Sequence, residues 1–198
     1  MNVDFDFQDE LDFFKNDRRK EAKDINAKSI VTKNKRKTIF IKRTETIQKM
    51  IPNRFEENDS THIISNGSFG SNELLTAINN KFNINVLWIT TWSINNDFID
   101  SIKKMTLNKL YFLCDKSLKS RKIAYYGRMM EAIKKIDSKV KMIAGLHSKV
   151  TIAETEKMGK LIIEASANYS KNVRIEQFVV TRDEALYNFH KDWMKKLL

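Results

Sequence analysis

Cysteine is nearly absent from this chain of 198 residues, which contains Cys114 and no other. A single cysteine excludes a disulfide framework and fits a reducing compartment. Long apolar runs are missing too, and none approaches the roughly 20 residues that span a bilayer. The acidic first residues lack the apolar stretch of a secretory signal. We therefore expect a soluble intracellular protein that has no membrane partner.

Acidic residues are the minority among the charged ones, 25 against 36 Lys and Arg, and the formal net charge is +11. A pI near 9.6 favours a polyanion partner, most often nucleic acid. A generally Lys-rich surface with no such partner would give the same numbers. About two hundred residues fit one domain with a tail.

The charge is unevenly distributed along the chain. Residues 1–14 hold five acidic residues and no Lys or Arg, with four Phe between them, whereas residues 15–49 hold 13 Lys and Arg against 4 acidic residues. Such blocks usually behave as flexible interaction arms. We predict a charged arm over residues 1–55. Its acidic and aromatic tip is either a disordered tail or a peptide that docks on a partner protein or on a basic groove of this chain. Its basic part offers Lys35, Arg36 and Lys37 to substrate phosphates.

From residue 56 onward the pattern predicts one α/β domain over residues 56–198. Apolar runs predict strands over residues 61–65, 85–92, 110–113, 140–144, 146–153, 161–165 and 178–180. Helical spacing appears over residues 74–82, 98–102 and 123–133, and residues 181–184 read as a capping box. The helix after it should bury Ala185, Leu186, Phe189 and Trp193. Strands that alternate with helices predict a mixed, mostly parallel sheet flanked by helices.

One pair of strands should depart from this alternation. Residues 146–153 and 161–165 are joined by about seven residues around Gly159, too few for a parallel crossover. They should form a hairpin. Its ends would then gather His147 and Lys149 from one strand with Ser166 and Asn168 from the other.

These four residue types suit a phosphodiester. Lysine supplies a point charge, Ser and Asn supply neutral donors to non-bridging oxygens, and histidine can act as a nucleophile or an acid near pH 7. Taken alone, His-x-Lys is far more often an ordinary surface pair, so the spacing around it matters.

The pattern His147-x-Lys149-x4-Glu154, followed by Ala165-Ser166-x-Asn168, resembles the signature of the phospholipase D superfamily. That signature is His-x-Lys-x4-Asp, a short gap and Gly-Ser-x-Asn. The resemblance covers roughly residues 59–198. It is nearest to the single-motif, nuclease-like branch and to phospholipase D-like proteins of phages and mobile elements. This implies a location in the bacterial cytoplasm or with a virion.

The resemblance implies a function and roles for residues. His147 would attack phosphorus and form a phosphohistidine, Lys149, Ser166 and Asn168 would hold the phosphate oxygens, and Glu176 would orient His147. Arg174 would contact the substrate nearby. Two histidines are needed for the reaction, so a single-motif chain should act as a homodimer. No metal or other cofactor is implied, and the substrate would be DNA or RNA.

The other two histidines are expected to play no part. His62 lies within a predicted strand and is read as a core residue. His190 is read as surface or helix-end charge.

Three departures from the signature leave other functions open. Glu154 replaces Asp, Ala165 replaces Gly, and ten residues separate them where about six are usual. A nucleic-acid-binding or structural protein of a phage or mobile element that has lost turnover is the main alternative. A lipid phosphodiesterase is the least favoured, since no amphipathic membrane helix is evident.

Overall fold

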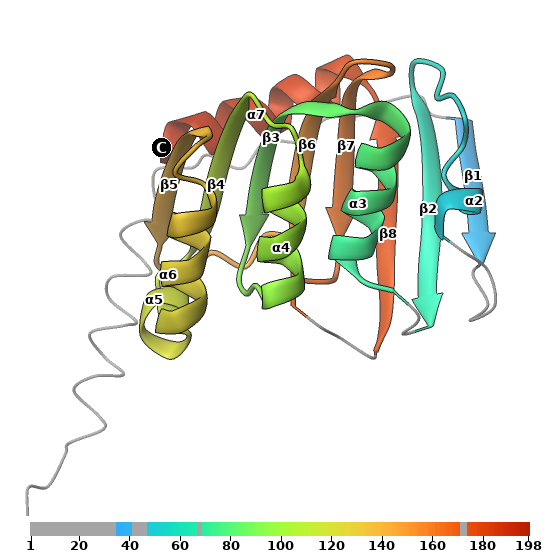
Figure 1. Cartoon of the computed structure of the whole chain (residues 1–198). Helices are drawn as coiled ribbons and strands as arrows, with labels where there is room; N and C mark the ends of the chain where they lie inside the picture. Colours follow the sequence, from blue (N-terminus) through green and yellow to red (C-terminus); the bar gives the residue numbers. More distant parts are fainter. Residues whose placement is uncertain (1–34, 41–46, 67–68, 171–173) are drawn as a thin grey trace, which may run out of the picture.

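The fold is built around one eight-stranded mixed sheet in a computed structural model that describes residues 35–40, 47–66, 69–170 and 174–198. The strand order is β1-β2-β8-β7-β6-β3-β4-β5 (Figure 1). The strands are β1 (Lys35–Phe40), β2 (Asp59–Asn66), β3 (Ile84–Thr91), β4 (Lys109–Asp115), β5 (Asp137–Ile143), β6 (Val150–Thr155), β7 (Gly159–Ala165) and β8 (Ile175–Arg182).

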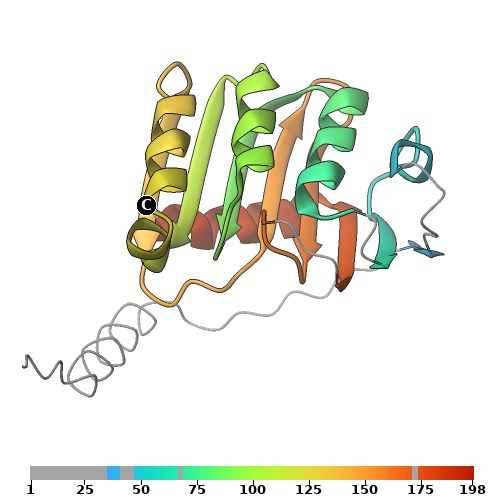
Figure 2. The ribbon, with the colours of Figure 1, turned by 60° about the horizontal axis from the view of Figure 1, so that its bottom comes forward.

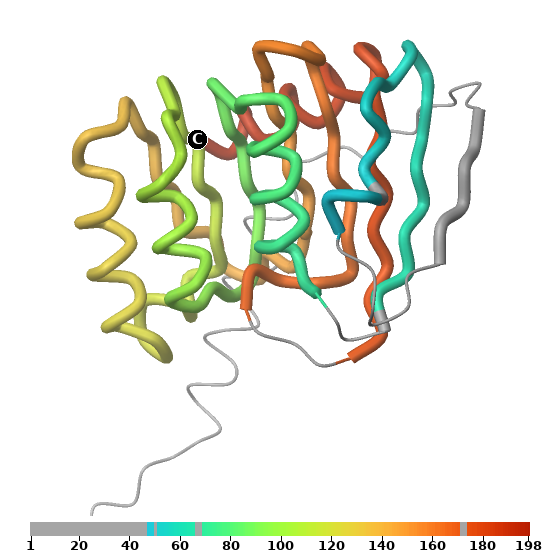
Figure 3. Tube along the Cα trace, turned by 45° about the vertical axis from the view of Figure 1, so that its right-hand side comes forward, coloured from blue at the N-terminus to red at the C-terminus, as the bar shows by residue number. Residues whose placement is uncertain are grey.

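Helices cover both faces of the sheet. One layer holds α3 (Ser71–Phe82), α4 (Asn96–Lys104), α5 (Ser117–Arg121) and α6 (Ile123–Ala132), while α7 (Glu184–Leu197) crosses the opposite face (Figures 1 and 2). The short helix α2 (Ile47–Met50) lies beside α3 and β2, as the turned view in Figure 3 also shows. The predicted class, an α/β sheet flanked by helices, is confirmed.

The balance of strand directions differs from the prediction. Three pairs are parallel, β1–β2, β3–β4 and β4–β5. Four are antiparallel, β2–β8, β3–β6, β6–β7 and β7–β8. Helical crossovers connect β3 to β4 and β4 to β5, whereas the second half of the chain returns through hairpins and a loop. Short connections cannot join parallel neighbours, so the middle of the sheet is antiparallel.

The expected hairpin is confirmed. Strands β6 and β7 pair antiparallel, with Val150 opposite Glu164 and Thr155 opposite Gly159. Gly159 has a φ of +73° at the turn, a conformation that a residue without Cβ adopts at little cost. The long gap of the motif is therefore absorbed by paired strand residues.

Side chains alternate between the two faces of the sheet along each strand, and apolar residues on both faces form two cores. On the side of α3, α4 and α6, buried apolar residues from β3, β4, β6, β7 and β8 form the larger one. On the side of α7, Trp88, Ile152 and Ile162 pack against Tyr187 and Met194. These layers exclude water from both faces of the central strands, which fixes their register.

Helix α7 begins two residues later than predicted, and its predicted apolar face is only partly confirmed. Thr181 lies in β8, and Asp183 caps the helix by accepting a hydrogen bond from Leu186 N at 2.8 Å. The buried residues are Tyr187, His190 and Met194, whereas Ala185 is exposed. Leu186 and Trp193 of the predicted face are half-buried and pack against the same cluster as Tyr187 and Met194.

The predicted arm, residues 1–55, lies largely outside the described residues, including its acidic and aromatic tip. The described parts belong to the folded domain. Strand β1 pairs with β2, and Ile51 and Phe55 are at most 2% exposed in the larger core. Because both side chains are buried against the domain, the folded region begins before residue 56.

Candidate active site

The predicted catalytic residues gather at one end of the sheet. Strand β3 ends there, and β6 starts there because it runs antiparallel to β3. For the same reason β7 ends there and β8 begins there. The topology thus brings Lys149, Ser166 and Glu176 to the same end of the sheet, although 27 positions separate Lys149 from Glu176 in the sequence.

His147 and Lys149 lie just before β6, which begins at Val150 and not at residue 146 as predicted. The backbone is nevertheless tied to the sheet, because Ala165 N donates to Lys149 O at 3.0 Å. The Lys149 ammonium lies 3.0 Å from Nδ1 of His147 and donates to the His147 carbonyl at 2.6 Å. His147 itself is exposed, so its ring is accessible from solvent.

Two opposing effects act on the Lys149 ammonium. Burial is the larger, and it lowers the pKa of Lys149 below the ordinary value. Attraction to the Glu176 carboxylate partly offsets this, because a nearby negative charge favours the ammonium form.

Glu176 is tied to Ser166. The Ser166 hydroxyl donates to Oε2 of Glu176 and accepts a hydrogen bond from Gln177 N at 2.9 Å. A second backbone bond, Ser166 N to Gln177 O at 3.0 Å, extends the pairing of β7 with β8. Glu176 is 9% exposed and thus holds its charge behind the more exposed residues. Its direct action on the His147 ring stays a prediction.

Asn168 connects the motif to the end of β3. Its Oδ1 accepts from Trp92 N at 3.1 Å and from Thr91 Oγ1 at 3.3 Å. A backbone N–H can only donate, so the amide oxygen must face β3. The amide NH₂ of Asn168 therefore faces away from that backbone and is oriented to serve as a donor.

Residues at the ends of β3 and β4 were not identified from the sequence. Thr90 Oγ1 donates to Val150 O at 3.1 Å and accepts from Val150 N at 2.9 Å, which fixes the start of β6. The Trp92 ring lies 6.1 Å from the His147 ring, and the Arg121 guanidinium lies 4.0 Å above Trp92. Position was an available signal for Trp92, which directly follows a buried strand, whereas Arg121 ends α5 and no local pattern marks it.

The first two departures from the signature lie at opposite ends of the β6–β7 hairpin, Glu154 near the turn and Ala165 at the site. Glu154 accepts from the Tyr187 hydroxyl at 2.6 Å and from Lys191 at 3.2 Å. It therefore anchors α7 to the sheet. Burial raises the pKa of Glu154, but the Tyr187 and Lys191 contacts outweigh it and lower the pKa overall. Ala165, which replaces Gly, is half-buried and pairs with Phe178 of β8.

The other histidines lie elsewhere. His62 is half-buried within β2. His190 is buried rather than at the surface, with Nδ1 accepting from Trp193 Nε1 at 3.0 Å and Nε2 3.3 Å from a Glu164 carboxylate oxygen. It is buried because α7 turns that side toward the sheet.

Of the predicted substrate-binding residues, Arg174 lies near the site and the other three do not. Arg174 is exposed, two residues before Glu176. Lys35, Arg36 and Lys37 pair with Asp59, Ser60 and Thr61, whereas Glu176 pairs with Ser65. Four to six strand residues separate these rows, or about 13–20 Å at the rise of a β-strand.

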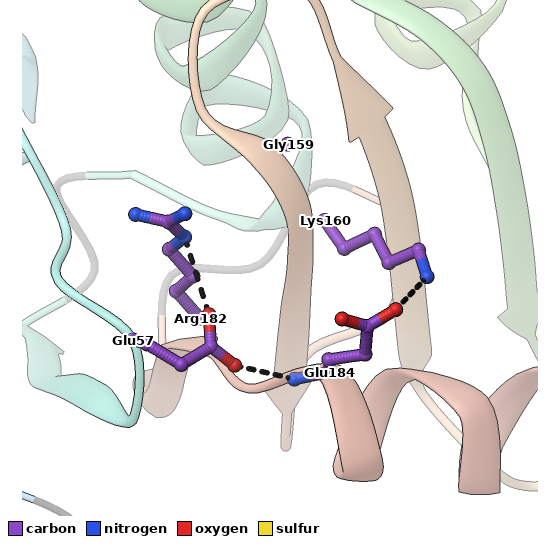
Figure 4. Close-up of a pocket in the computed structure, with 5 residues that line it drawn as sticks. All are labelled: Glu57, Gly159, Lys160, Arg182 and Glu184. Carbon is purple, nitrogen blue, oxygen red and sulfur yellow. Dashed lines mark hydrogen bonds and ion pairs between the residues drawn. The ribbon is translucent and has the colours of Figure 1, made fainter.

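A hollow of about 220 Å³ lies at the opposite end of the sheet, lined by Glu57, Gly159, Lys160, Arg182 and Glu184 (Figure 4). Its charges neutralise one another. Arg182 lies 3.5 Å from Glu57, and Lys160 pairs with Glu184. Glu57 also accepts from Glu184 N at 2.8 Å. The hollow therefore presents little unpaired charge to a ligand.

Within the described part of the chain, no three His, Cys, Asp or Glu side chains come together in a group that could hold a metal ion. Among the helices of residues 47–66, 69–170 and 174–198, none is both long and apolar enough to cross a membrane.

Comparisons with known proteins place the fold. No family model and no curated protein matches the chain. Among solved structures, the phospholipase D family member Nuc from Salmonella typhimurium superposes with a TM-score of 0.53 at 14% identity, covering 70% of this chain and 93% of Nuc. NucT from Helicobacter pylori gives 0.51 at 18% identity, covering 70% and 95%. The archaeal chromatin protein TrmBL2 gives 0.50 at 12% identity, covering 76% and 53%.

The coverage of Nuc and NucT is nearly complete, so the likeness concerns a whole domain and not a shared βαβ unit. It agrees with the resemblance inferred from the motif at residues 147–168. The chain has the fold of the phospholipase D superfamily.

Proposed function

We propose that this chain is a metal-independent phosphodiesterase that cleaves DNA or RNA as a homodimer through a phosphohistidine intermediate. The observation that supports it best is the contact of Lys149 with His147, at the sheet end where Ser166, Asn168 and Glu176 converge. The proposal assigns one nucleophile, one cation and two neutral polar groups to this end of the sheet.

In the first step a ring nitrogen of His147 attacks phosphorus. The N–P bond forms as the bond from phosphorus to the leaving oxygen breaks, and His147 of the second copy gives that oxygen its proton. Attack needs a free lone pair, and Nδ1 of His147 accepts from the Lys149 ammonium in the unliganded chain. Substrate binding would draw the ammonium to a non-bridging oxygen and release the ring.

In the second step water attacks the phosphohistidine. The now neutral His147 of the second copy takes a proton from that water, the P–O bond forms, and the P–N bond breaks with its electron pair returning to the first His147. Each cycle consumes one water molecule and restores both rings. Splitting one displacement into two lowers the barrier of each, and Lys149 and Asn168 from both copies would stabilise the equatorial charge.

The homodimer follows from the count of motifs. The chain carries one His-x-Lys motif, and the other two histidines, His62 and His190, lie in β2 and α7. A two-fold axis brings the same side chain from two copies together. The exposure of His147 leaves it able to meet its counterpart.

A nucleic acid suits the charge of the chain. The net charge of +11 favours a polyanion, and phosphate contacts would make binding steeply dependent on salt. Arg174 would add a contact beside the site, and Lys35, Arg36 and Lys37 would add contacts farther along a bound strand. The structural neighbour TrmBL2 is described as an archaeal chromatin protein with a novel mode of DNA binding.

The test is incubation of labelled single- and double-stranded DNA and RNA with the full chain, with and without EDTA. The wild type should cleave at least one substrate equally well in EDTA. His147→Ala should lose cleavage, whereas the control His62→Ala, also a histidine but away from the site, should keep it. Loss of all cleavage in EDTA, or full activity in His147→Ala, contradicts the mechanism.

A second candidate is a nucleic-acid-binding protein without turnover. It is favoured by the Lys149 ammonium, which occupies Nδ1 of His147, and by the likeness to TrmBL2. The site would then hold a phosphate without cleaving it. Gel shifts distinguish the two, since this function predicts tight binding that is unchanged by His147→Ala and cleavage of none of the four substrates.

A further inference from the structure

The Trp92 indole is the large aromatic group next to the proposed nucleophile. Its ring centre lies 6.1 Å from that of His147, with the planes tilted by 50°. The Arg121 guanidinium lies 4.0 Å above the same indole. The proposed chemistry uses neither side chain, although together they form one wall of the site.

The backbone holds Trp92 in place from several sides. Its N–H donates to Asn168 Oδ1 at 3.1 Å. Two residues on, Ile94 forms a β-bridge with Tyr169, and Asn95 N donates to Tyr169 O at 2.9 Å. The Lys122 ammonium donates to Ser93 Oγ at 3.1 Å. The indole, which we call the Trp92 platform, is therefore carried by a fixed backbone segment rather than by a free loop.

Arg121, by contrast, can leave the platform. It is exposed and ends the short helix α5, where it donates to Ser117 Oγ. Trp92 is half-buried and Arg121 is exposed, and stacking of a guanidinium at an exposed site is worth only about 0.5–1 kcal/mol. A flat cation on an aromatic face occupies the place that a nucleobase would take, and a base stacks there more strongly.

We infer that a nucleobase of the substrate stacks on the Trp92 indole in place of the Arg121 guanidinium, which then moves to a neighbouring phosphate. This inference rests on the proposed function, because it takes the scissile phosphate to lie at His147. Because the ring centres of Trp92 and His147 are only 6.1 Å apart, the stacked base belongs to a nucleotide close to the bond that breaks.

The inference specifies the substrate class. A base can lie flat on Trp92 only when it is not stacked within a duplex, so single strands, or ends and bulges, should bind better than intact double helices. Stacking accepts every base because each has a π-face. The platform should therefore confer little preference among sequences.

The test measures binding rather than turnover, in EDTA and at low temperature, by fluorescence anisotropy of labelled oligonucleotides. Each protein is titrated with a single strand of thymidine nucleotides and with an abasic strand of equal length and charge. The variants are Trp92→Ala, Trp92→Phe and Arg121→Ala. The control is Arg128→Ala, which removes the same charge from an exposed position on α6.

Trp92→Ala should weaken binding of the thymidine strand about tenfold and leave the abasic strand within about twofold. Trp92→Phe should recover most of the loss, which shows that the domain is folded and that the ring matters. Arg121→Ala and Arg128→Ala should weaken both strands alike and only slightly. Equal losses for both strands in Trp92→Ala, or none, overturn the inference.

Failure of the proposed function leaves a different signature. If the wild type cleaves nothing but Trp92→Ala weakens binding of the thymidine strand alone, the stacking inference holds and the proposed enzyme activity fails. If the wild type cleaves but Trp92→Ala affects both strands alike, the enzyme activity holds and the stacking inference fails. A wild type that binds neither strand overturns the platform itself.

Discussion

The Ser166 hydroxyl donates a hydrogen bond to Oε2 of the buried Glu176 carboxylate, while Glu176 also attracts the Lys149 ammonium. The negative charge of the site is thus held at the back of the cluster, and the cation lies in front of it. Burial lowers the pKa of Lys149, and Glu176 limits that decrease. A phosphate binder needs the ammonium form, so Glu176 acts here through Lys149.

This arrangement predicts a shift in pH dependence for Glu176→Gln. Removing the carboxylate removes the attraction that favours the ammonium, so the pKa of Lys149 should fall further. Oligonucleotide affinity, measured across alkaline pH, should then decline at lower pH than in the wild type. The control is Glu156→Gln, an exposed residue beyond the far end of β6, which makes the same change in net charge. An identical alkaline limb in Glu176→Gln and the control would contradict the coupling.

The orientation of Asn168 predicts opposite behaviour for two substitutions. Asn168→Asp keeps an acceptor for Trp92 N and Thr91 Oγ1 but replaces the amide donor with a negative charge. Its melting temperature should stay close to that of the wild type, and its affinity for oligonucleotides should fall at least about tenfold. Asn168→Ala leaves both donors without this acceptor and should lose about 1–3 kcal/mol of unfolding free energy. Thermal melts and anisotropy titrations check the pair, and an Asp variant that binds normally would place Asn168 outside the phosphate site.

A shared site at a two-fold axis predicts that inactive subunits are dominant over active ones. Wild type and His147→Ala are mixed in equal amounts and allowed to exchange subunits. Only about a quarter of random dimers then contain two wild-type copies, so activity should fall to about that fraction. His62→Ala serves as the mixing control and should leave activity unchanged. Activity that stays at half in the His147→Ala mixture would show that each chain works alone.

The sequence predicted the class of the fold and the position of the hairpin, because these depend on local periodicity and on connection length. In strand β3, residues Val86 to Thr91 are all apolar or β-branched, and such a run predicts a strand from local sequence alone. The turn at Gly159 follows from a short link between two strands. The direction of β8 relative to β2 does not follow in this way, since it depends on the long loop before Glu176.

Only part of the candidate site could be predicted from the sequence, because the rest depends on contacts between segments far apart in the chain. Lys149 and Ser166 lie close together because of one hairpin, which local spacing predicts. Trp92 lies just after β3 and Arg121 ends α5, and local spacing does not predict that they reach the motif. The burial of His190 was also hidden, because it depends on how α7 packs against β6 and β7.

We predict that Glu154 stabilises the fold by an amount that depends on pH. It accepts from Tyr187 and Lys191, and these contacts lower its pKa despite the opposing effect of burial. A carboxyl whose pKa is depressed in the folded state stabilises it fully above the ordinary value of 4.5 and loses that contribution as the pH falls through the depressed value. Glu154→Gln should therefore cost about 1 kcal/mol of unfolding free energy at neutral pH and progressively less in acid.

Urea unfolding across this range checks the prediction for Glu154. The control is Glu131→Gln, which alters an exposed pair with Lys134 on α6 and should cost little at any pH. A cost in Glu154→Gln that is the same at neutral and acid pH would show that the charge of this carboxylate does not stabilise the fold.

We predict that the Cys114 thiol reacts only when the domain unfolds. Its side chain is 0% exposed, and burial, followed by the neighbouring Asp115, raises its pKa to about 12. The thiolate is the reactive form, so at about pH 8 only roughly one molecule in 10⁴ would carry it even if reagent could enter. Iodoacetamide should label the native chain at the rate at which the domain opens and label it rapidly in concentrated guanidinium chloride. The control is Ser120→Cys, which adds an exposed thiol on α5 and should take up one label per chain without denaturant. Equally fast labelling of Cys114 in the native wild type would contradict the prediction and mean that the end of β4 is open to solvent.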